Sequence, residues 1–201
     1  MRRIALATQR QCLAAAVDFP RMRLFVGIPP SSEVRGELTR VLAPAITKAA
    51  EWRWAPPESW HTTLLFLGST SHEKYELVST QLRALQSPAI PIQINGVDFF
   101  KRAGIFFAGI FPCPELSMLH QKVTEAAAQC GFAPEARAYH PHITLARAKE
   151  KLHQKTLSAL RERLPARPEF SPIRAQEFLL FESFLSPAGA RYEIRERFAL
   201  R

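Results

Sequence analysis

The chain has 201 residues, of which 47% are hydrophobic and 22% charged, and this composition is that of a globular protein. The length suits one sizeable core or two small packed lobes, but not several independent domains. No apolar run approaches the roughly 18 residues of a membrane span, so we expect no transmembrane helix. Lysine and arginine total 27 against 18 acidic residues, and the net charge of +9 favours a polyanionic partner such as a nucleic acid.

The first 21 residues differ in composition from the rest of the chain. Their charged residues are Arg2, Arg3, Arg10, Arg21 and Asp18. The apolar stretch among them is short and broken by polar residues, unlike that of a secretory signal, although a mitochondrial-type presequence fits the composition. We predict a basic, loosely packed extension over residues 1–21 and a single folded domain over residues 22–201.

The three cysteines are Cys12, Cys113 and Cys130. They are too few and too scattered for a disulfide framework, and they lack the CxxC spacing of a metal site. The sequence therefore predicts reduced thiols and a cytoplasmic location.

From Met22 onward, predicted strands and helices alternate. The expected strands cover 24–28, 61–67, 90–99, 104–111, 142–146, 177–185 and 192–200. The expected helices cover 33–46, 72–85, 115–128 and 152–164. Ser31 or Ser32 caps the first helix, which Pro44 interrupts or kinks, and Ser71 caps the second. Gly68 is expected to end its strand. The pattern predicts an α+β protein with antiparallel-rich sheets and a few flanking helices.

A short internal repeat carries the chemistry. The tetrapeptides His-Thr-Thr-Leu at 61–64 and His-Ile-Thr-Leu at 142–145 share the pattern His-x-Thr-Leu. Because side chains alternate along a strand, each histidine shares a face with its threonine, about 6.5–7 Å away. Strict alternation places Phe66 on the opposite face from His61. One such tetrapeptide is usually a packing feature, whereas two at the start of predicted strands point to a shared site.

Two imidazoles and two hydroxyls that meet across a cleft suit a phosphodiester. A neutral histidine can deprotonate water, and a protonated histidine can donate a proton to the leaving oxygen. The ordinary pKa of histidine, about 6.5, allows both forms near neutrality. The threonines can donate hydrogen bonds to the phosphate oxygens, and no metal ion is required.

The sequence from Met22 to Arg201 resembles the two-histidine (2H) phosphoesterase superfamily, and more narrowly the RNA 2′,3′-cyclic phosphodiesterases of bacteria and archaea, long called 2′-5′ RNA ligases. Residues 60–68 and 141–147 resemble the two family motifs, the second with its Ala-Arg extension. Residues 23–28 resemble the opening strand. Residues 181–192 resemble the C-terminal hairpin.

The resemblance implies a bilobal fold with two similar lobes around a central cleft. It implies hydrolysis of RNA 2′,3′-cyclic phosphate ends to 2′-phosphomonoesters without a cofactor or metal. His61 is the expected proton donor and His142 the expected proton acceptor, although the near-equivalent motifs do not fix this assignment. Thr63, Thr144 and Arg147 are the expected phosphate ligands. Strict alternation places Arg147 opposite His142, so its role requires a bulge or twist near Ala146.

Other functions remain open at this stage. One alternative is a non-catalytic domain that holds RNA or a nucleotide. Another is an enzyme that acts on 2′-5′-linked oligonucleotides or on ADP-ribose cyclic phosphate. A third is the reverse reaction, which joins RNA ends such as tRNA fragments through a 2′-5′ bond. We expect a monomer without an obligate protein partner or a membrane contact.

Several other residues have a structural interpretation. His140 and His142 lack a third ligand at metal-site spacing. His72, His120 and His153 fall on predicted helices and are expected at the surface. At least two of Trp52, Trp54 and Trp60 are expected in the core. Lys101 and Arg102 occupy a predicted hairpin turn, which is either simply solvated or in contact with an RNA backbone.

Overall fold

The computed structural model describes residues 20–47, 49–135, 137–150, 153–166, 168–187 and 189–201. The strands are β1 (Met22–Ile28), β2 (Trp52–Trp54), β3 (Thr62–Thr70), β4 (Ile90–Ile92), β5 (Ile94–Phe100), β6 (Ile105–Ile110), β7 (His142–Ala148), β8 (Ile173–Ala175), β9 (Glu177–Ser186) and β10 (Gly189–Ala199). The α-helices are α1 (Ser32–Ile46), α2 (His72–Arg83), α3 (Pro114–Gln129) and α4 (Gln154–Arg161). Two short 3-10 turns are η1 (Pro57–Ser59) and η2 (Lys101–Ala103).

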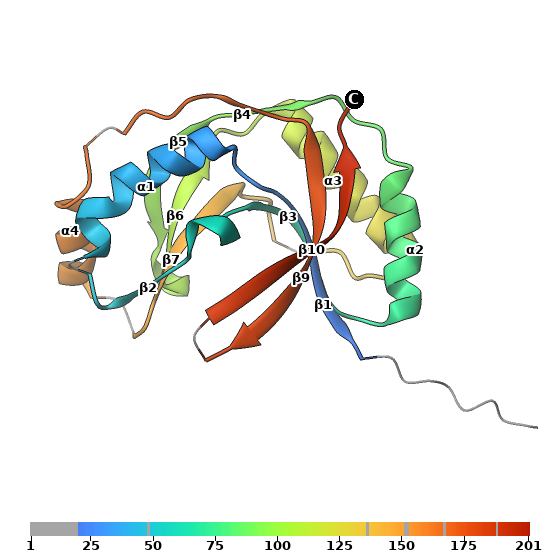
Figure 1. The fold of residues 1–201 in the computed structure, drawn as a ribbon, viewed down its shortest axis with the longest axis horizontal. Coiled ribbons are helices and arrows are strands. Elements are labelled where there is room, and N and C mark those ends of the chain that lie inside the picture. The colour runs from blue at the N-terminus through green and yellow to red at the C-terminus, as the bar shows by residue number, and fades with distance from the viewer. Residues whose placement is uncertain (1–19, 48, 136, 151–152, 167, 188) are drawn as a thin grey trace, which may run out of the picture.

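Eight antiparallel strands form one sheet. Seven follow the order β10-β9-β1-β3-β7-β6-β5. The eighth strand, β2, lies outside this order and pairs with β7. Figure 1 shows β2, β5, β6 and β7 with α1 and α4 at one end of the molecule, and β1, β3, β9 and β10 with α2 and α3 at the other. Strands β4 and β8 form a separate two-stranded sheet. The predicted α+β class with two antiparallel-rich lobes is confirmed.

A single residue pair joins the two halves of the sheet. Thr62 of β3 lies opposite Ile143 of β7, and no other pair links these strands among the described residues. Thr62 is 2% exposed and Ile143 is 1% exposed, so both side chains point into the interior. The junction therefore falls one residue after each histidine of the repeated motif.

The helix caps follow the sequence prediction. The Ser31 hydroxyl accepts a hydrogen bond from the Val34 amide, and the Ser71 hydroxyl accepts one from the Lys74 amide. Each cap satisfies a donor that the first helical turn would otherwise leave open. Pro44 was expected to interrupt or kink the first helix. It lies inside α1, close to the C-terminal end, and does not interrupt the helix.

Three predicted elements differ from the observed ones. The stretch 90–99 is divided at Gln93 into β4 and β5, because β4 pairs with β8 in the small sheet whereas β5 pairs with β6 in the large one. Strand β3 continues through Gly68, which adopts a left-handed φ of 71° beside a bulge. Helix α4 is shorter than the predicted 152–164, and residues 151–152 lie outside the described residues.

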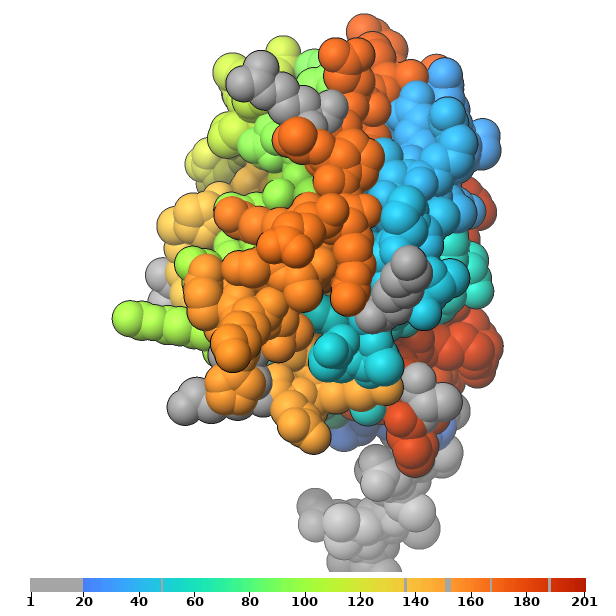
Figure 2. Space-filling model, turned by 90° about the vertical axis from the view of Figure 1, so that its left-hand side faces the viewer, coloured from blue at the N-terminus to red at the C-terminus, as the bar shows by residue number. Residues whose placement is uncertain are grey.

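The segment after α4 connects α1 with the strands of the same lobe by hydrogen bonds. Figure 2 looks onto the α4 end and shows this segment between α1 and the strands at β4–β5. The Ser171 hydroxyl donates to a carboxylate oxygen of Glu37 on α1, at 2.6 Å. Hydrogen bonds from Ser171 lower the pKa of the Glu37 carboxyl.

The predicted N-terminal extension falls almost wholly outside the described residues, which begin at Pro20. Arg21 donates two hydrogen bonds to Ser69 near the end of β3. No helix in the described part of the chain is long and apolar enough to cross a membrane.

Gly27 on β1 provides a first test of the junction. A Cβ atom there would lie 2.9 Å from the Thr62 carbonyl oxygen and 3.3 Å from Cδ2 of His61. We expect Gly27→Ala to lower the free energy of unfolding by about 1–3 kcal/mol through overpacking. The measurement is urea unfolding followed by circular dichroism.

Gly36 on α1 is the matched control, because a Cβ atom there would meet nothing within 4 Å. Gly36→Ala is expected to raise the stability by about 0.5–1 kcal/mol through helix propensity. Equal stability changes in both variants would contradict the tight approach of β1 to His61.

Candidate active site

The junction between β3 and β7 brings the two predicted histidines together. His61 directly precedes Thr62, and His142 directly precedes Ile143. Because the paired residues point into the core, alternation turns both histidines to the opposite face. Diagonal neighbours of this kind lie about 7–8 Å apart in a regular ladder. A positive charge on His142 contributes to lowering the pKa of His61, as this proximity requires.

Both imidazoles are oriented in the same way. Nδ1 of His61 lies 2.7 Å from the Ser59 carbonyl oxygen, and Nδ1 of His142 lies 2.7 Å from the His140 carbonyl oxygen. A carbonyl only accepts, so each Nδ1 carries the hydrogen. This leaves Nε2 of each neutral ring without a proton and free to exchange one.

Aromatic side chains surround His61. Its ring centroid lies 4.5 Å from that of Phe25, 5.7 Å from Phe181 and 5.2 Å from Tyr192. Burial against these rings disfavours the charged imidazole and is the largest cause that lowers the pKa of His61, to about 4. His61 is therefore neutral in the free protein at pH 7.

His142 has a comparable but different environment. Its ring meets Phe100 edge-on at 5.0 Å and Phe107 at 5.4 Å. Burial is again the largest cause that lowers the pKa of His142, and the nearby charges of Arg147 and His140 lower it further.

The predicted threonines lie two residues beyond the histidines. Thr63 is opposite Gly27 of β1, and Thr144 is opposite Phe107 of β6. Both side chains are half-buried. The antiparallel register places Thr144 beside His61 and Thr63 beside His142. The four groups predicted from the repeat therefore converge at the junction.

Strand β7 contains the bulge that Arg147 requires. Thr144 pairs with Phe107 and Ala146 pairs with Phe106, so Leu145 has no partner on β6. Leu145 and Ala146 are both fully buried, and Arg147 returns to the face of His142. The charge of Arg147 affects His142 and also Tyr192 of β10 in the other lobe.

The same irregularity occurs in β3. Thr63 pairs with Gly27 and Leu65 pairs with Val26, which leaves the motif leucine Leu64 unpaired. Phe66 consequently lies on the side of His61, where its ring is 6.0 Å from Phe25 and the side chain is 59% exposed. The strict alternation expected from the sequence is wrong at this point, because a bulge shifts the pattern by one residue.

The chain resembles known proteins in both sequence and fold. Residues 30–176 match the family model of the 2′-5′ RNA ligase superfamily. The chain belongs to this superfamily. The family inferred from the two motifs is thereby confirmed.

Relatives in this superfamily cover most of the chain. A Thermotoga maritima protein named RNA 2′,3′-cyclic phosphodiesterase is 26% identical over 180 residues, which are 86% of this chain and 92% of the relative. A relative with the same name from Escherichia coli is 28% identical and covers 89% of this chain and 96% of its own length. The crystal structure of E. coli LigT complexed with 3′-AMP superimposes with a TM-score of 0.76 at 27% identity, covering 90% of this chain and 98% of that one.

Two open pockets flank the histidines in this member of the superfamily. One, of about 820 Å³, is lined by Phe100, Phe107 and His140 and extends to Asn95 and Arg161. The other, of about 320 Å³, lies beside Ser59, Phe181 and Tyr192 on the His61 side.

Sequence reasoning missed most of the aromatic lining of this superfamily site. The predicted site residues do not include Phe25, Phe100, Phe107, Phe181 or Tyr192. Their signal was weak because apolar residues occupy both faces of these strands. A search for aromatics at alternate positions on the neighbouring strands would have found Phe107, which lies opposite Thr144.

Several other sequence predictions are resolved. Trp52 and Trp60 are buried in the core, as expected. His120 is not at the surface, because its Nδ1 lies 2.8 Å from the Leu64 carbonyl oxygen and its ring stacks on Tyr139 at 3.9 Å. Within the described ranges, no group of three or more His, Cys, Asp or Glu residues is arranged to hold a metal ion.

The environment of the histidines predicts their titration. We expect the His61 imidazole to titrate near pH 4 and His142 below the ordinary 6.5, because burial disfavours both charged forms. As the pH falls from 6.5 towards 4, the unfolded chain binds a proton at residue 61 before the folded one does, so this site loses stability in that window. Nuclear magnetic resonance of the ring protons, with His61→Gln and His142→Gln for assignment, measures both values. Titration of His61 at or above 6.5 would contradict the apolar environment.

Proposed function

We propose that this protein is an RNA 2′,3′-cyclic phosphodiesterase that opens the cyclic phosphate to a 2′-phosphomonoester by acid-base catalysis with two histidines. One observation carries the proposal: the two motif histidines flank the single β3–β7 pair, with both Nδ1 atoms held by carbonyls. The relatives bearing that enzyme name add support.

In the proposed reaction, Nε2 of His142 removes a proton from water as the water oxygen attacks phosphorus. The bond between phosphorus and O3′ breaks, and His61 donates its proton to O3′. The 2′-phosphate remains on the ribose, and the two histidines return to their starting states by proton exchange with solvent. No redox change occurs, and each proton has a donor and an acceptor.

Arg147 favours His142 as the proton acceptor. Burial is the largest cause that lowers the pKa of His142, and the positive charge of Arg147 lowers it further, which favours the neutral ring that a general base requires. Burial is the largest cause of the low pKa of His61. A phosphate anion within about 4–6 Å of His61 opposes this effect and stabilises the imidazolium, which a general acid requires.

Thr63, Thr144 and Arg147 are the proposed phosphate ligands. The hydroxyls flank the histidines at the junction, and Arg147 reaches the same face through the β7 bulge. A guanidinium can donate two parallel hydrogen bonds to phosphate oxygens, so Arg147 would also balance the charge that develops in the transition state.

The proposed substrate is RNA that ends in a 2′,3′-cyclic phosphate, which includes tRNA fragments. The excess of basic residues suits such a polyanion. Ligation through a 2′-5′ bond is the reverse of ring opening and requires two RNA ends held together, whereas hydrolysis requires one. We therefore propose hydrolysis as the principal direction.

The test removes each histidine separately. His61→Ala and His142→Ala are expected to lower kcat on adenosine 2′,3′-cyclic phosphate by about 10²–10⁴-fold, because each removes a proton-transfer group. His72→Ala on α2, where the side chain is 51% exposed, is the matched control and is expected to retain activity.

Circular dichroism shows whether each variant is folded. Wild-type turnover by a folded His61→Ala or His142→Ala protein would refute the mechanism. If the wild-type protein binds RNA in a salt-dependent way but turns over neither the mononucleotide nor oligonucleotides, a binding module is the better explanation.

A further inference from the structure

Two arginines face each other beside the proposed active site. Arg53 of β2 is the ladder partner of Arg147 of β7. Directly opposed residues share a face of the sheet, and their Cβ atoms lie about 4.5–5.5 Å apart. Arg53 therefore lies on the same face as Arg147 and His142. Trp52 and Trp54 on either side of it pack against the core.

Among the residues that the structure describes, neither guanidinium group has an ion-pair partner. Arg53 and Arg147 are exposed, and neither makes an ion pair with any residue in the described segments. By contrast, Arg195 and Arg197 on β10 are each paired with a glutamate. Like charges directly opposite each other destabilise a sheet. An anion bound between them would remove this cost.

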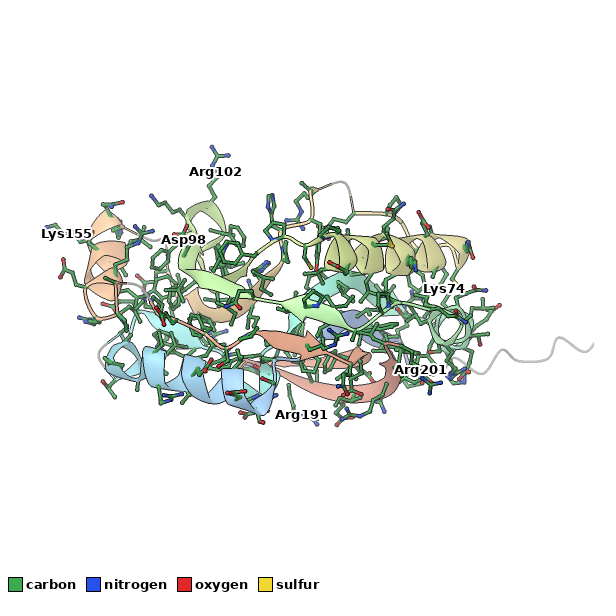
Figure 3. All side chains as sticks on the ribbon, turned by 90° about the horizontal axis from the view of Figure 1, so that it is seen from above. Lys74, Asp98, Arg102, Lys155, Arg191 and Arg201 are labelled. Atoms are coloured by element: carbon green, nitrogen blue, oxygen red, sulfur yellow. The ribbon has the colours of Figure 1, made fainter. Side chains whose placement is uncertain are left out.

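More cations lie beside this pair. The Ala148 amide donates to the Gly104 carbonyl at 2.8 Å, which holds η2 against the end of β7. Lys101 and Arg102 of η2 are exposed, as is Lys149, and Figure 3 shows Arg102 projecting outward from the ribbon. We call Arg53, Lys101, Arg102, Arg147 and Lys149 the basic rim.

The acidic residues next to the basic rim do not neutralise it. Glu51 directly precedes β2, and Glu150 follows β7 by two residues. The five cations of the basic rim therefore have two carboxylates as close neighbours in the sequence. Asp98 on β5 is already engaged by Arg161. The rim therefore keeps a net positive charge at one end of the cleft, which attracts a polyanion in a salt-dependent way.

We propose that the basic rim is a second phosphate subsite, in which Arg53 binds the phosphodiester on the 5′ side of the terminal nucleoside while Arg147 binds the cyclic phosphate. The inference rests on the proposed function for the position of the cyclic phosphate. In such a terminus O2′ and O3′ are both esterified within the ring, so the RNA continues only through O5′. The next phosphate that the protein meets is the 5′ one.

This subsite makes the enzyme selective for RNA ends over cyclic mononucleotides. A mononucleoside 2′,3′-cyclic phosphate has no second phosphate and gains nothing from Arg53. An oligonucleotide gains a charge-assisted contact at Arg53 and further attraction from Lys101 and Arg102. Arg53 thus acts as a specificity residue rather than as part of the proton-transfer machinery.

The experiment compares two substrates in three proteins. The substrates are adenosine 2′,3′-cyclic phosphate and the trinucleotide ApApA with the same cyclic end. The proteins are the wild type, Arg53→Gln and Lys155→Gln. Lys155 on α4 is the matched loss of one positive charge in the same lobe, and Figure 3 shows it away from Arg102.

We expect Arg53→Gln to lower kcat/KM on the trinucleotide by about 5–10-fold and on the mononucleotide by much less. The slope of log(kcat/KM) against log[salt] for the trinucleotide should become shallower by about 0.7, the value for one phosphate contact on a single strand. Lys155→Gln should leave the ratio between the substrates at the wild-type value.

An equal loss on both substrates, or an unchanged ratio, would overturn the second subsite. If the wild-type protein hydrolyses neither substrate, the proposed function fails instead. The subsite is then judged by equilibrium binding of the fluorescently labelled trinucleotide. Weaker binding with a shallower salt slope in Arg53→Gln than in Lys155→Gln supports it, and equal binding refutes it.

Discussion

The pairing of Thr62 with Ile143 is the constraint on which the site depends. Longer ladders hold each half of the sheet together, but this pair alone joins β3 to β7 in the described chain. Burial of both side chains fixes which face the preceding histidines take, since a one-residue slip would turn them into the core. The two histidines proposed to transfer protons are therefore positioned by backbone pairing and by the burial of their neighbours.

The environment around this junction changes the chemistry of two otherwise ordinary histidines. Phe25, Phe181 and Tyr192 pack around the partly buried His61, and Phe100 and Phe107 border His142. Burial lowers the pKa of both rings, so under the proposed mechanism the anionic substrate would stabilise the protonated form of the general acid. Arg147 lies on the His142 side and makes the surroundings of the two motifs unequal, which is the basis of the proposed acid and base assignment.

The alternation of strands and helices was enough to predict the α+β class, and the two motifs with the opening strand and the C-terminal hairpin indicated the superfamily. Strand alternation, which is a local rule, predicted that each motif histidine shares a face with its threonine. The same rule failed at Phe66, and it left Arg147 on the wrong face unless β7 was irregular. The motif leucines Leu64 and Leu145 occupy bulges that depend on pairing with β1 and β6. The pairing of Arg53 with Arg147 across the ladder could likewise not be predicted, because β2 and β7 are far apart in the sequence and become neighbours only in the folded chain.

The most direct test of the two-histidine account is the product formed from adenosine 2′,3′-cyclic phosphate in excess EDTA. The purified protein is incubated with this substrate, and the 2′- and 3′-monophosphates are separated by chromatography. The account predicts sustained turnover and exclusively the 2′-phosphate, because protonation of O3′ makes it the leaving group. Formation of the 3′-phosphate, or loss of turnover with EDTA, would contradict it.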